Sequence, residues 1–215
     1  LPEPATLLLP QRSHWLRFNH ALVKNGDRVR RGDVLAIDSA HFGLPLLAPL
    51  GGTVQLRAHR GHITLAELDT GGAEGISPQA SAEGQNEHAL DPQRQSLVAL
   101  GAWSFLFDAH TDAIPDPRQP ANAAIVTTAR LEPFAGPRGN VLLGQSFDAF
   151  LRGLDLLVSL VEGTVYVAVP RVRGELASRL RQALATRPNV KTIDIPLRYP
   201  MDHFNVLVRA LGLAP

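Results

Sequence analysis

The clearest pattern of apolar residues lies in the second half of the chain, where they recur at intervals of three and four. The first series comprises Phe147, Phe150, Leu151, Leu154, Leu157, Val158 and Val161, and the second Leu176, Ala177, Leu180, Ala183 and Leu184. This spacing predicts two amphipathic helices, because residues three and four apart share one helix face. Ser146 is placed to cap the first helix, and Gly163 stands just beyond its predicted end.

Three short runs predict strands that alternate with these helices: Ala123–Thr128, Thr164–Val169 and Val190–Ile195. The order β-α-β-α-β favours a parallel sheet with right-handed crossovers, which predicts a small Rossmann-like three-layer α/β domain. We expect a short closing helix over His203–Leu211 and an earlier helix over 94–108, followed by a Pro-rich loop over 114–120.

The first third of the chain has a different pattern. Residues 5–69 consist of short apolar stretches broken by Gly, Pro and Asp, which is typical of a small all-β module. Residues 70–93 are rich in Gly, Ser and Ala and have almost no large apolar side chain, so they read as a linker. The predicted organisation is therefore a β module over 1–70, a linker over 71–93 and an α/β domain over 94–215.

Composition excludes several kinds of chemistry. The chain has 215 residues and no cysteine, so cysteine-bound iron–sulfur or zinc sites, disulfides and thiol nucleophiles are excluded. Its 21 Lys+Arg and 20 Asp+Glu argue against a nucleic-acid partner, which usually requires a basic face. No apolar run approaches the roughly 18–20 residues of a membrane span, so we expect no transmembrane segment of its own. The start, Leu1-Pro2-Glu3-Pro4, lacks an initiator Met and suggests a trimmed chain.

Repeated Gly-Asp turns characterise the β module. They stand in Val23–Val29 and Arg30–Leu35, and Ala48–Val54 follows with the pattern A-P-x-x-G-x-V. Together these motifs resemble the barrel-sandwich hybrid fold of biotinyl and lipoyl carrier domains. Such carriers hold their prosthetic group on a lysine in the hairpin between the motifs, but Ala36–Leu47 contains no lysine, and Lys24 lies in the first turn. Carrier function is therefore excluded, which leaves an interaction or scaffolding module.

The α/β domain also lacks the usual signals of catalysis. Ala129–Asn140, after the first strand, contains no G-x-G-x-x-G loop for a pyrophosphate. His59 and His62 have no third ligand nearby, so we predict no metal site. Ser146 lacks the final glycine of a G-x-S-x-G elbow and is explained as a helix cap, and we predict no catalytic residue.

Several short motifs together point to a family. The first strand runs into Glu132-Pro133, preceded by Gly101-Ala102-Trp103 and Ile114–Pro117, and Val165–Val167 follows the long helix. Over about residues 7–196 the chain resembles the A subunit of sodium-translocating NADH:quinone reductase (NqrA-like) and the C subunit of the Rnf electron-transport complex (RnfC-like). More distantly it is similar to the flavin-binding NADH subunit of respiratory complex I. The resemblance implies a peripheral subunit of a membrane redox complex on the cytoplasmic face of the bacterial inner membrane, with the other subunits as partners.

Departures from that family change the expected chemistry. Where flavin-binding relatives have G-x-G-G-A-x-F-P, Gly101–Phe107 brings in bulky rings, and Arg130 replaces the first acid of E-x-E-P. We therefore predict a structural or assembly subunit without cofactor or redox centre. The alternatives are an electron-transfer subunit that binds flavin mononucleotide, NADH or quinone, and a free-standing adaptor with the same fold. The aromatic residues are expected to be core between helix and sheet: Trp103, Phe105, Phe107 and Phe134.

The candidate ligand-binding crevice lies beyond the carboxyl ends of the predicted strands, where open α/β sheets bind ligands. The residues expected to face it are Thr127, Thr128, Arg130, Glu132, Arg171 and Arg173. The arginines could take an anionic ligand or a carboxylate of a partner protein. A solvated loop with an Arg130–Glu132 contact explains the same residues without a ligand.

Overall fold

A computed structural model describes residues 4–69, 90–128, 131, 146–171 and 174–213, apart from the side chain of residue 176. By its contacts the chain divides into two compact units, Leu1–Arg118 and Gln119–Pro215. The helical segment after residue 90 is thus grouped with the first unit. The linker expected over 71–93 lies almost wholly outside the described residues, and the domain boundaries at 70 and 94 stay predictions.

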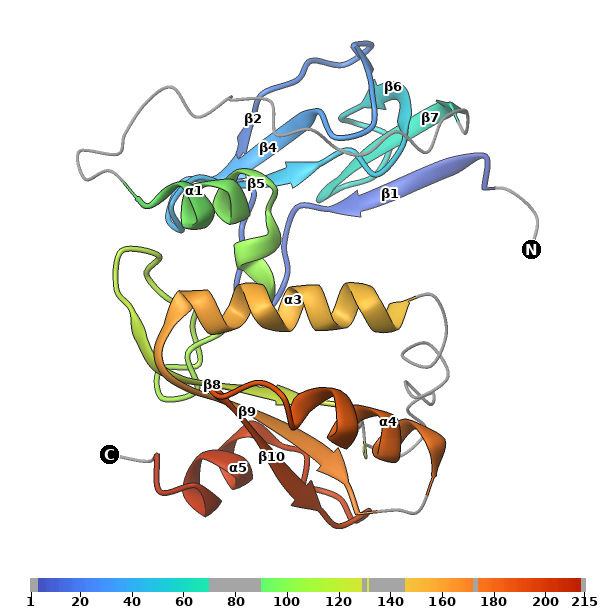
Figure 1. Cartoon of the computed structure of the whole chain (residues 1–215). Helices are drawn as coiled ribbons and strands as arrows, with labels where there is room; N and C mark the ends of the chain where they lie inside the picture. The colour runs from blue at the N-terminus through green and yellow to red at the C-terminus, as the bar shows by residue number, and fades with distance from the viewer. Residues whose placement is uncertain (1–3, 70–89, 129–130, 132–145, 172–173, 214–215) are drawn as a thin grey trace. The chain divides into compact units, whose positions relative to one another are not determined.

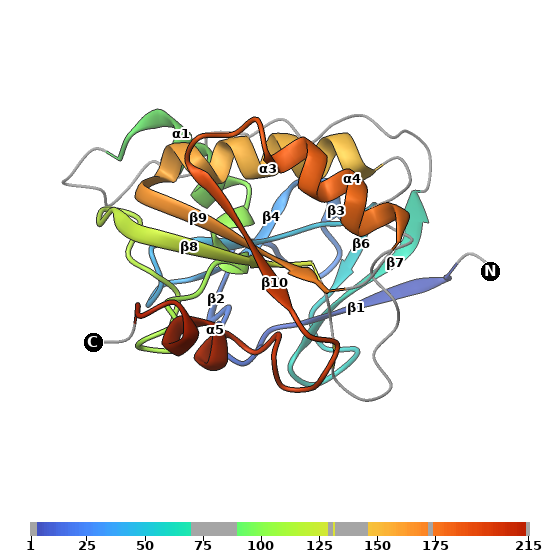
Figure 2. The same ribbon diagram turned by 60° about the horizontal axis from the view of Figure 1, so that its bottom comes forward.

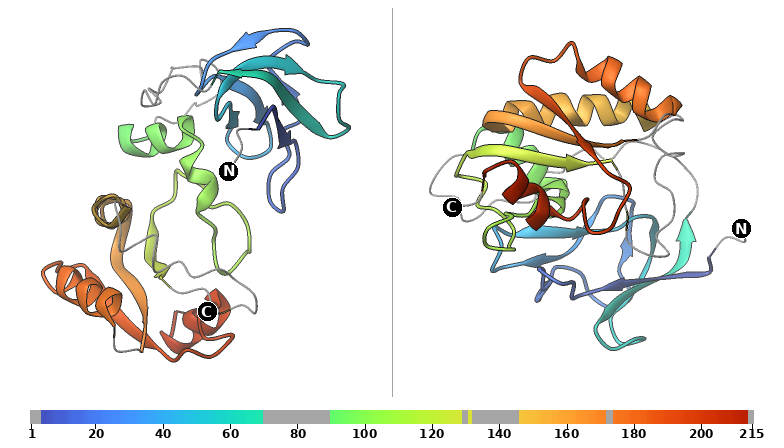
Figure 3. Two further views of the ribbon diagram at one scale, coloured as in Figure 1. Left: turned by 90° about the vertical axis from the view of Figure 1, so that its right-hand side faces the viewer. Right: turned by 90° about the horizontal axis from the view of Figure 1, so that it is seen from below.

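The first unit contains two antiparallel sheets (Figures 1 and 3). One sheet has the order β1 (Thr6–Pro10), β7 (His62–Asp69), β6 (Gly51–Gln55) and β3 (Arg28–Val29), and the other has the order β2 (His20–Ala21), β4 (Val34–Asp38) and β5 (Leu44–Leu47). Their core is apolar and fully buried, and includes Leu35, Leu44, Val54, Ile63 and Leu65. The strands expected over 5–69 are therefore present, and the barrel-sandwich assignment stays a prediction.

The helix expected over 94–108 is two short helices instead. Helix α1 (Pro92–Ala99) begins at Asp91, whose side chain accepts hydrogen bonds from the backbone N–H groups of Gln93 and Arg94. It ends before Gly101, whose φ of 66° is left-handed and easily adopted only by glycine. The 3₁₀ helix η1 (Ala102–Phe105) then follows. The prediction of one continuous helix was wrong because the left-handed glycine breaks it.

The second unit is a three-stranded parallel sheet covered by helices (Figures 1 and 2). The sheet order is β10 (Val190–Ile195), β9 (Val161–Pro170) and β8 (Ala121–Thr127); helices α3 (Ser146–Leu160) and α4 (Glu175–Leu184) lie on one face, and α5 (Phe204–Ala210) lies on the other. The alternation of strands and helices confirms the prediction of a mixed α/β protein. The Rossmann-like assignment stays a prediction.

Strand β9 forms the centre of the second unit. Val165, Val167 and Val169 point to one face and are fully buried, in a core shared with α3 and α4. Ala168 points to the opposite face, where it packs with Ile195 and Leu207. This alternation is the two-residue period of a strand buried on both faces.

Gly163 lies inside β9 and not beyond the end of the preceding helix, as the sequence pattern suggested. Helix α3 ends at Leu160 and the strand begins at the next residue. A Cβ atom on Gly163 would collide with the carbonyl oxygen of Asn122 in β8. The glycine is therefore required by the close approach of two strands, where they pair through a bulge between Ala121 and Ala123.

This close approach predicts opposite effects for two glycine substitutions. Gly163→Ala should lower the free energy of unfolding of the second unit by about 2 kcal/mol or more, because the backbone must shift. Gly153→Ala, in α3 with open space around it, should raise it by about 0.5–1 kcal/mol through helix propensity. Urea unfolding of both variants measures the difference, and equal effects would show that the strands do not approach as described.

Candidate functional site

The carboxyl ends of the three parallel strands meet at one edge of the second unit. Thr127 is the last residue of β8 and is half-buried. The buried Thr128 donates its hydroxyl hydrogen to the Ala168 carbonyl oxygen at 2.8 Å. The exposed Arg171 donates its backbone N–H to the Ile195 carbonyl oxygen at 2.7 Å. These two hydrogen bonds join neighbouring strands just beyond their paired residues.

Thr127, Thr128 and Arg171 therefore lie at the predicted edge. The other residues expected there, Arg130, Glu132 and Arg173, lie outside the described residues. The hydroxyl hydrogen of Thr128 is committed to the sheet, so that hydroxyl could serve a ligand only through its oxygen lone pairs. Ligand binding by these residues stays a prediction.

Asp202 is a polar residue near this edge that the sequence pattern did not single out. Its Oδ2 accepts the backbone N–H of Leu131 at 2.7 Å, which ties the chain after β8 to the loop before α5. Its Oδ1 is buried and has no hydrogen-bond partner. The sequence signal that could have pointed to Asp202 is its position directly before His203, the N-cap residue of α5. The Nδ1 atom of His203 accepts the backbone N–H of Asn205 at 3.3 Å.

In the first unit, the resemblance to carrier domains would place a carrier lysine in the hairpin between β4 and β5. Its tip, residues 39–43, turns through positive φ angles at Phe42 and Gly43. Lys24 is exposed in an earlier turn, where its backbone N–H donates to Asp27 Oδ2 at 2.7 Å. The tip of the hairpin thus has no amine to carry a prosthetic group.

A buried carboxylate, Asp38, lies at the end of β4, directly before the tip of the hairpin. Asp38 accepts hydrogen bonds from the backbone N–H groups of Arg17 at 2.7 Å and Ala40 at 2.9 Å, and its Oδ2 lies 2.9 Å from His41 Nδ1. Burial alone would raise the pKa of Asp38, but these hydrogen bonds and the neighbouring His41 outweigh burial and lower the pKa. The ionised carboxylate therefore fastens the segment around Arg17 to the hairpin.

The aromatic residues have different environments. Trp103 is 4% exposed and donates its Nε1–H to the Pro115 carbonyl oxygen at 2.8 Å, which confirms it as core. Phe105 is 86% exposed, so the prediction that it is core was wrong. The single turn of η1 buries Trp103 and leaves Phe105 in solvent. Phe107 is 39% exposed, so the prediction that it is core was also wrong; its ring stacks on Trp15 with ring centroids 5.8 Å apart. Phe134 lies outside the described residues.

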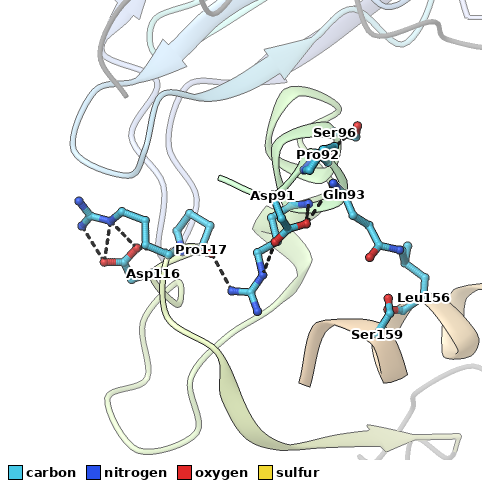
Figure 4. Close-up of polar contacts among 10 residues, drawn as sticks. Asp91, Pro92, Gln93, Ser96, Asp116, Pro117, Leu156 and Ser159 are labelled. Atoms are coloured by element: carbon cyan, nitrogen blue, oxygen red, sulfur yellow. Dashed lines mark hydrogen bonds and ion pairs between the residues drawn. The ribbon is translucent and has the colours of Figure 1, made fainter. Parts of the chain in front are cut away.

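Arg94 joins Asp91 to Pro117, both labelled in Figure 4, and so fixes the segment that follows η1. Its Nε lies 2.9 Å from Asp91 Oδ2, and its Nη1 donates to the Pro117 carbonyl oxygen at 2.7 Å. Its guanidinium carbon lies 6.0 Å from the centre of the Trp103 ring. Nearby, hydrogen bonds from the Arg118 guanidinium lower the pKa of the Asp116 carboxyl. Helix α1, Trp103 and residues 115–118 thus form one connected structure.

Metal ligands do not gather in the part of the chain that the structure describes. No group of three or more His, Asp or Glu side chains there is arranged to hold an ion. His62 of the HRGH turn has its Nδ1 3.0 Å from the Arg60 carbonyl oxygen. Among the helices within the described ranges, none combines the length and the apolar character needed to cross a bilayer.

Comparison with known proteins now defines the class. Residues 90–204, more than half of the chain, match the family described as the NqrA second alpha/beta domain. The chain is 30% identical over 154 residues to the A subunit of the Na(+)-translocating NADH-quinone reductase of Klebsiella pneumoniae (strain 342), an alignment that covers 69% of this chain and 34% of that protein. The corresponding protein of Vibrio atlanticus (strain LGP32) is 31% identical over 153 residues, covering 69% and 33%. The match thus spans about a third of the length of these relatives.

The second part of the chain therefore contains an α/β domain of the kind that this family model describes. The chain belongs to the NqrA family, as the sequence motifs predicted.

The buried carboxylate at the hairpin predicts a pH-dependent stability. Because the pKa of Asp38 is lowered below its ordinary 3.8, its stabilising contribution is present above that value and is lost as pH falls through the lower folded-state pKa. Asp38→Asn should lower the free energy of unfolding at pH 7 by about 1–3 kcal/mol. The variant should also lose stability less steeply than the parent between about pH 5 and 2.

Unfolding by denaturant at a series of pH values measures this effect. Asp27→Asn is the matched control, because Asp27 is an exposed carboxylate that accepts a backbone N–H in another turn of the same unit. An equal loss of stability in both variants, with identical pH profiles, would show that Asp38 has no special role.

Proposed function

We propose that this chain is a structural or assembly subunit, without a redox centre of its own, of a membrane-associated electron-transport complex of the Na+-translocating NADH:quinone reductase type. It would bind the other subunits peripherally, on the cytoplasmic face of the bacterial inner membrane. Membership of the NqrA family supports the host complex, because the relatives are named as the A subunit of that reductase. The assignment to this chain of a host complex, a face and a role is our proposal.

The single observation that favours a structural role is the environment of Trp103. In flavin-binding relatives the corresponding loop is rich in glycine, so that its backbone can approach the cofactor. Here the Trp103 ring is buried, its N–H is bonded to the Pro115 carbonyl, and Arg94 lies beside it. The Trp103 ring and the Arg94 guanidinium fill this region with side chains. The Trp103 N–H is bonded within the protein, so these contacts serve its structure.

The chemistry of the remaining candidates agrees with this proposal. The absence of cysteine excludes a cysteine-bound iron–sulfur cluster, and the hairpin tip offers no lysine for a carrier group. At the carboxyl edge of the sheet, Thr128 donates to Ala168, and Asp202 accepts from Leu131. Two of the polar side chains at this edge thus fasten loops and strands.

One observation keeps an electron-transfer role as the second candidate. Asp202 Oδ1 is buried without a hydrogen-bond partner, and such an orphan acceptor has a cost that a ligand donor could remove. A flavin mononucleotide, NADH or quinone at the crevice would make the chain an electron-transfer subunit. A free-standing adaptor that uses the same fold is the third possibility.

The proposal of a place in such a complex is tested by native purification. The full chain, tagged and expressed at its natural level, is extracted from membranes with mild detergent, and the proteins that migrate with it on a native gel are identified by mass spectrometry. We expect it to migrate with integral membrane subunits of one redox complex. The soluble fraction of the same cells is the control. A chain found only there, as a monomer, would contradict the proposal.

A further inference from the structure

Side-chain hydrogen bonds fasten the segment after η1 to the first unit. The Trp103 Nε1–H donates to the Pro115 carbonyl oxygen at 2.8 Å. Two residues further on, Arg94 Nη1 donates to the Pro117 carbonyl oxygen at 2.7 Å (Figure 4). The first unit ends at Arg118. These two bonds therefore hold the chain in place to within one residue of the end of that unit.

Arg118 itself contacts the tip of the β4–β5 hairpin. Its guanidinium carbon lies 5.8 Å from the centre of the half-buried Phe42 ring, which is within the range of a cation–π interaction. The Asp116 carboxylate accepts hydrogen bonds from the same guanidinium, from Nε at 2.9 Å and from Nη2 at 2.6 Å. The arginine side chain is thus held by both a carboxylate and an aromatic ring.

Phe42 has a backbone conformation that phenylalanine does not favour. Its φ is 58° and that of Gly43 is 67°, and the Leu44 N–H donates to the His41 carbonyl oxygen at 3.0 Å. This β-turn has the positive φ values of type I′, in which glycine, asparagine and aspartate predominate. A bulky residue at such a position is strained and persists only where its surroundings hold it. The contact of the Phe42 ring with Arg118 helps to offset that strain.

The rest of the hairpin is held independently of Arg118. Asp38 accepts the backbone N–H groups of Arg17 and Ala40, which fixes the start of the tip. On the other strand, a Cβ atom on Gly101 would lie 3.2 Å from the Pro45 carbonyl oxygen, so η1 begins in close contact with β5. The hairpin therefore presents Phe42 from a firmly held base, and we expect it to stay folded when the ring is removed.

We propose that the tip of the hairpin is a latch, in which the Phe42 ring holds Arg118 and with it the end of the first unit. The hairpin in which carrier domains present a prosthetic group fastens a segment of its own chain here. With Arg118 held and β8 beginning at Ala121, the connector between the two units is residues 119–120, and not the linker expected over 71–93. Release of Arg118 lengthens that connector. The latch thereby sets the mobility of the chain where the two units join.

Trypsin cleavage of the full chain tests the latch, because cleavage after Arg118 requires this segment to open locally. Phe42→Gly removes the ring and suits the left-handed backbone better than phenylalanine does. We expect this variant to be cleaved after Arg118 about two to five times faster than the parent, which is the factor that a cation–π contact at an exposed site supplies. Initial rates are measured by mass spectrometry. Cleavage after Arg60, in an exposed turn, is the internal control and should keep its rate.

A second variant separates the effect of the ring from that of the backbone. Phe42→Tyr keeps an aromatic face beside Arg118, and we expect the parent rate of cleavage there. The proposal would be overturned if Phe42→Gly were cleaved after Arg118 at the parent rate, because the ring would then not hold the arginine. It would also be overturned if Phe42→Gly sped cleavage after Arg118 and Arg60 alike, or if Phe42→Tyr matched Phe42→Gly.

Discussion

The burial of β9 is the constraint on which the α/β unit depends. Its three valines are withdrawn from solvent by α3 and α4, and its Ala168 by α5. Full burial of a side chain of this size contributes about 1.5–3 kcal/mol, so this strand accounts for a large share of the unit's stability. Both neighbouring strands are positioned by it, and Gly163 allows β8 to approach it closely. Because β9 takes the centre of the three described strands, β8 and β10 each have one neighbouring strand.

The polar side chains near the β4–β5 hairpin and near the carboxyl edge of the sheet have one role in common: they hydrogen-bond to backbone groups of other segments. Asp38 holds the segment around Arg17 beneath the hairpin, and Asp202 holds Leu131 near the carboxyl edge of the sheet. Thr128 does the same between two strands. Trp103 ties η1 to Pro115. These contacts support the proposal that the chain has a structural role.

The sequence predicted the regular elements well and the polar contacts poorly. Helix α3 was predictable because burial imposes a period of 3.6 residues on its side chains. Strand β9 was predictable because a strand buried on both faces is a short, uncharged run rich in β-branched residues. The break of the helix at Gly101 was not predictable, because the sequence does not show that this glycine is left-handed, and its apolar neighbours fit a continuous helix. Phe105 was assigned to the core by its type alone, although a four-residue helix buries only part of its circumference. Asp38 and Asp202 bond to residues 21 and 71 positions away, and no local pattern encodes such distant partners.

We infer that the family fold is used here without a cofactor. Titration of the purified full chain with flavin mononucleotide and with NADH, followed by calorimetry, tests it most directly. We expect no saturable heat with either compound. Saturable binding that is lost in Glu132→Ala, a change at the predicted crevice, would contradict the account and establish the crevice as a cofactor site.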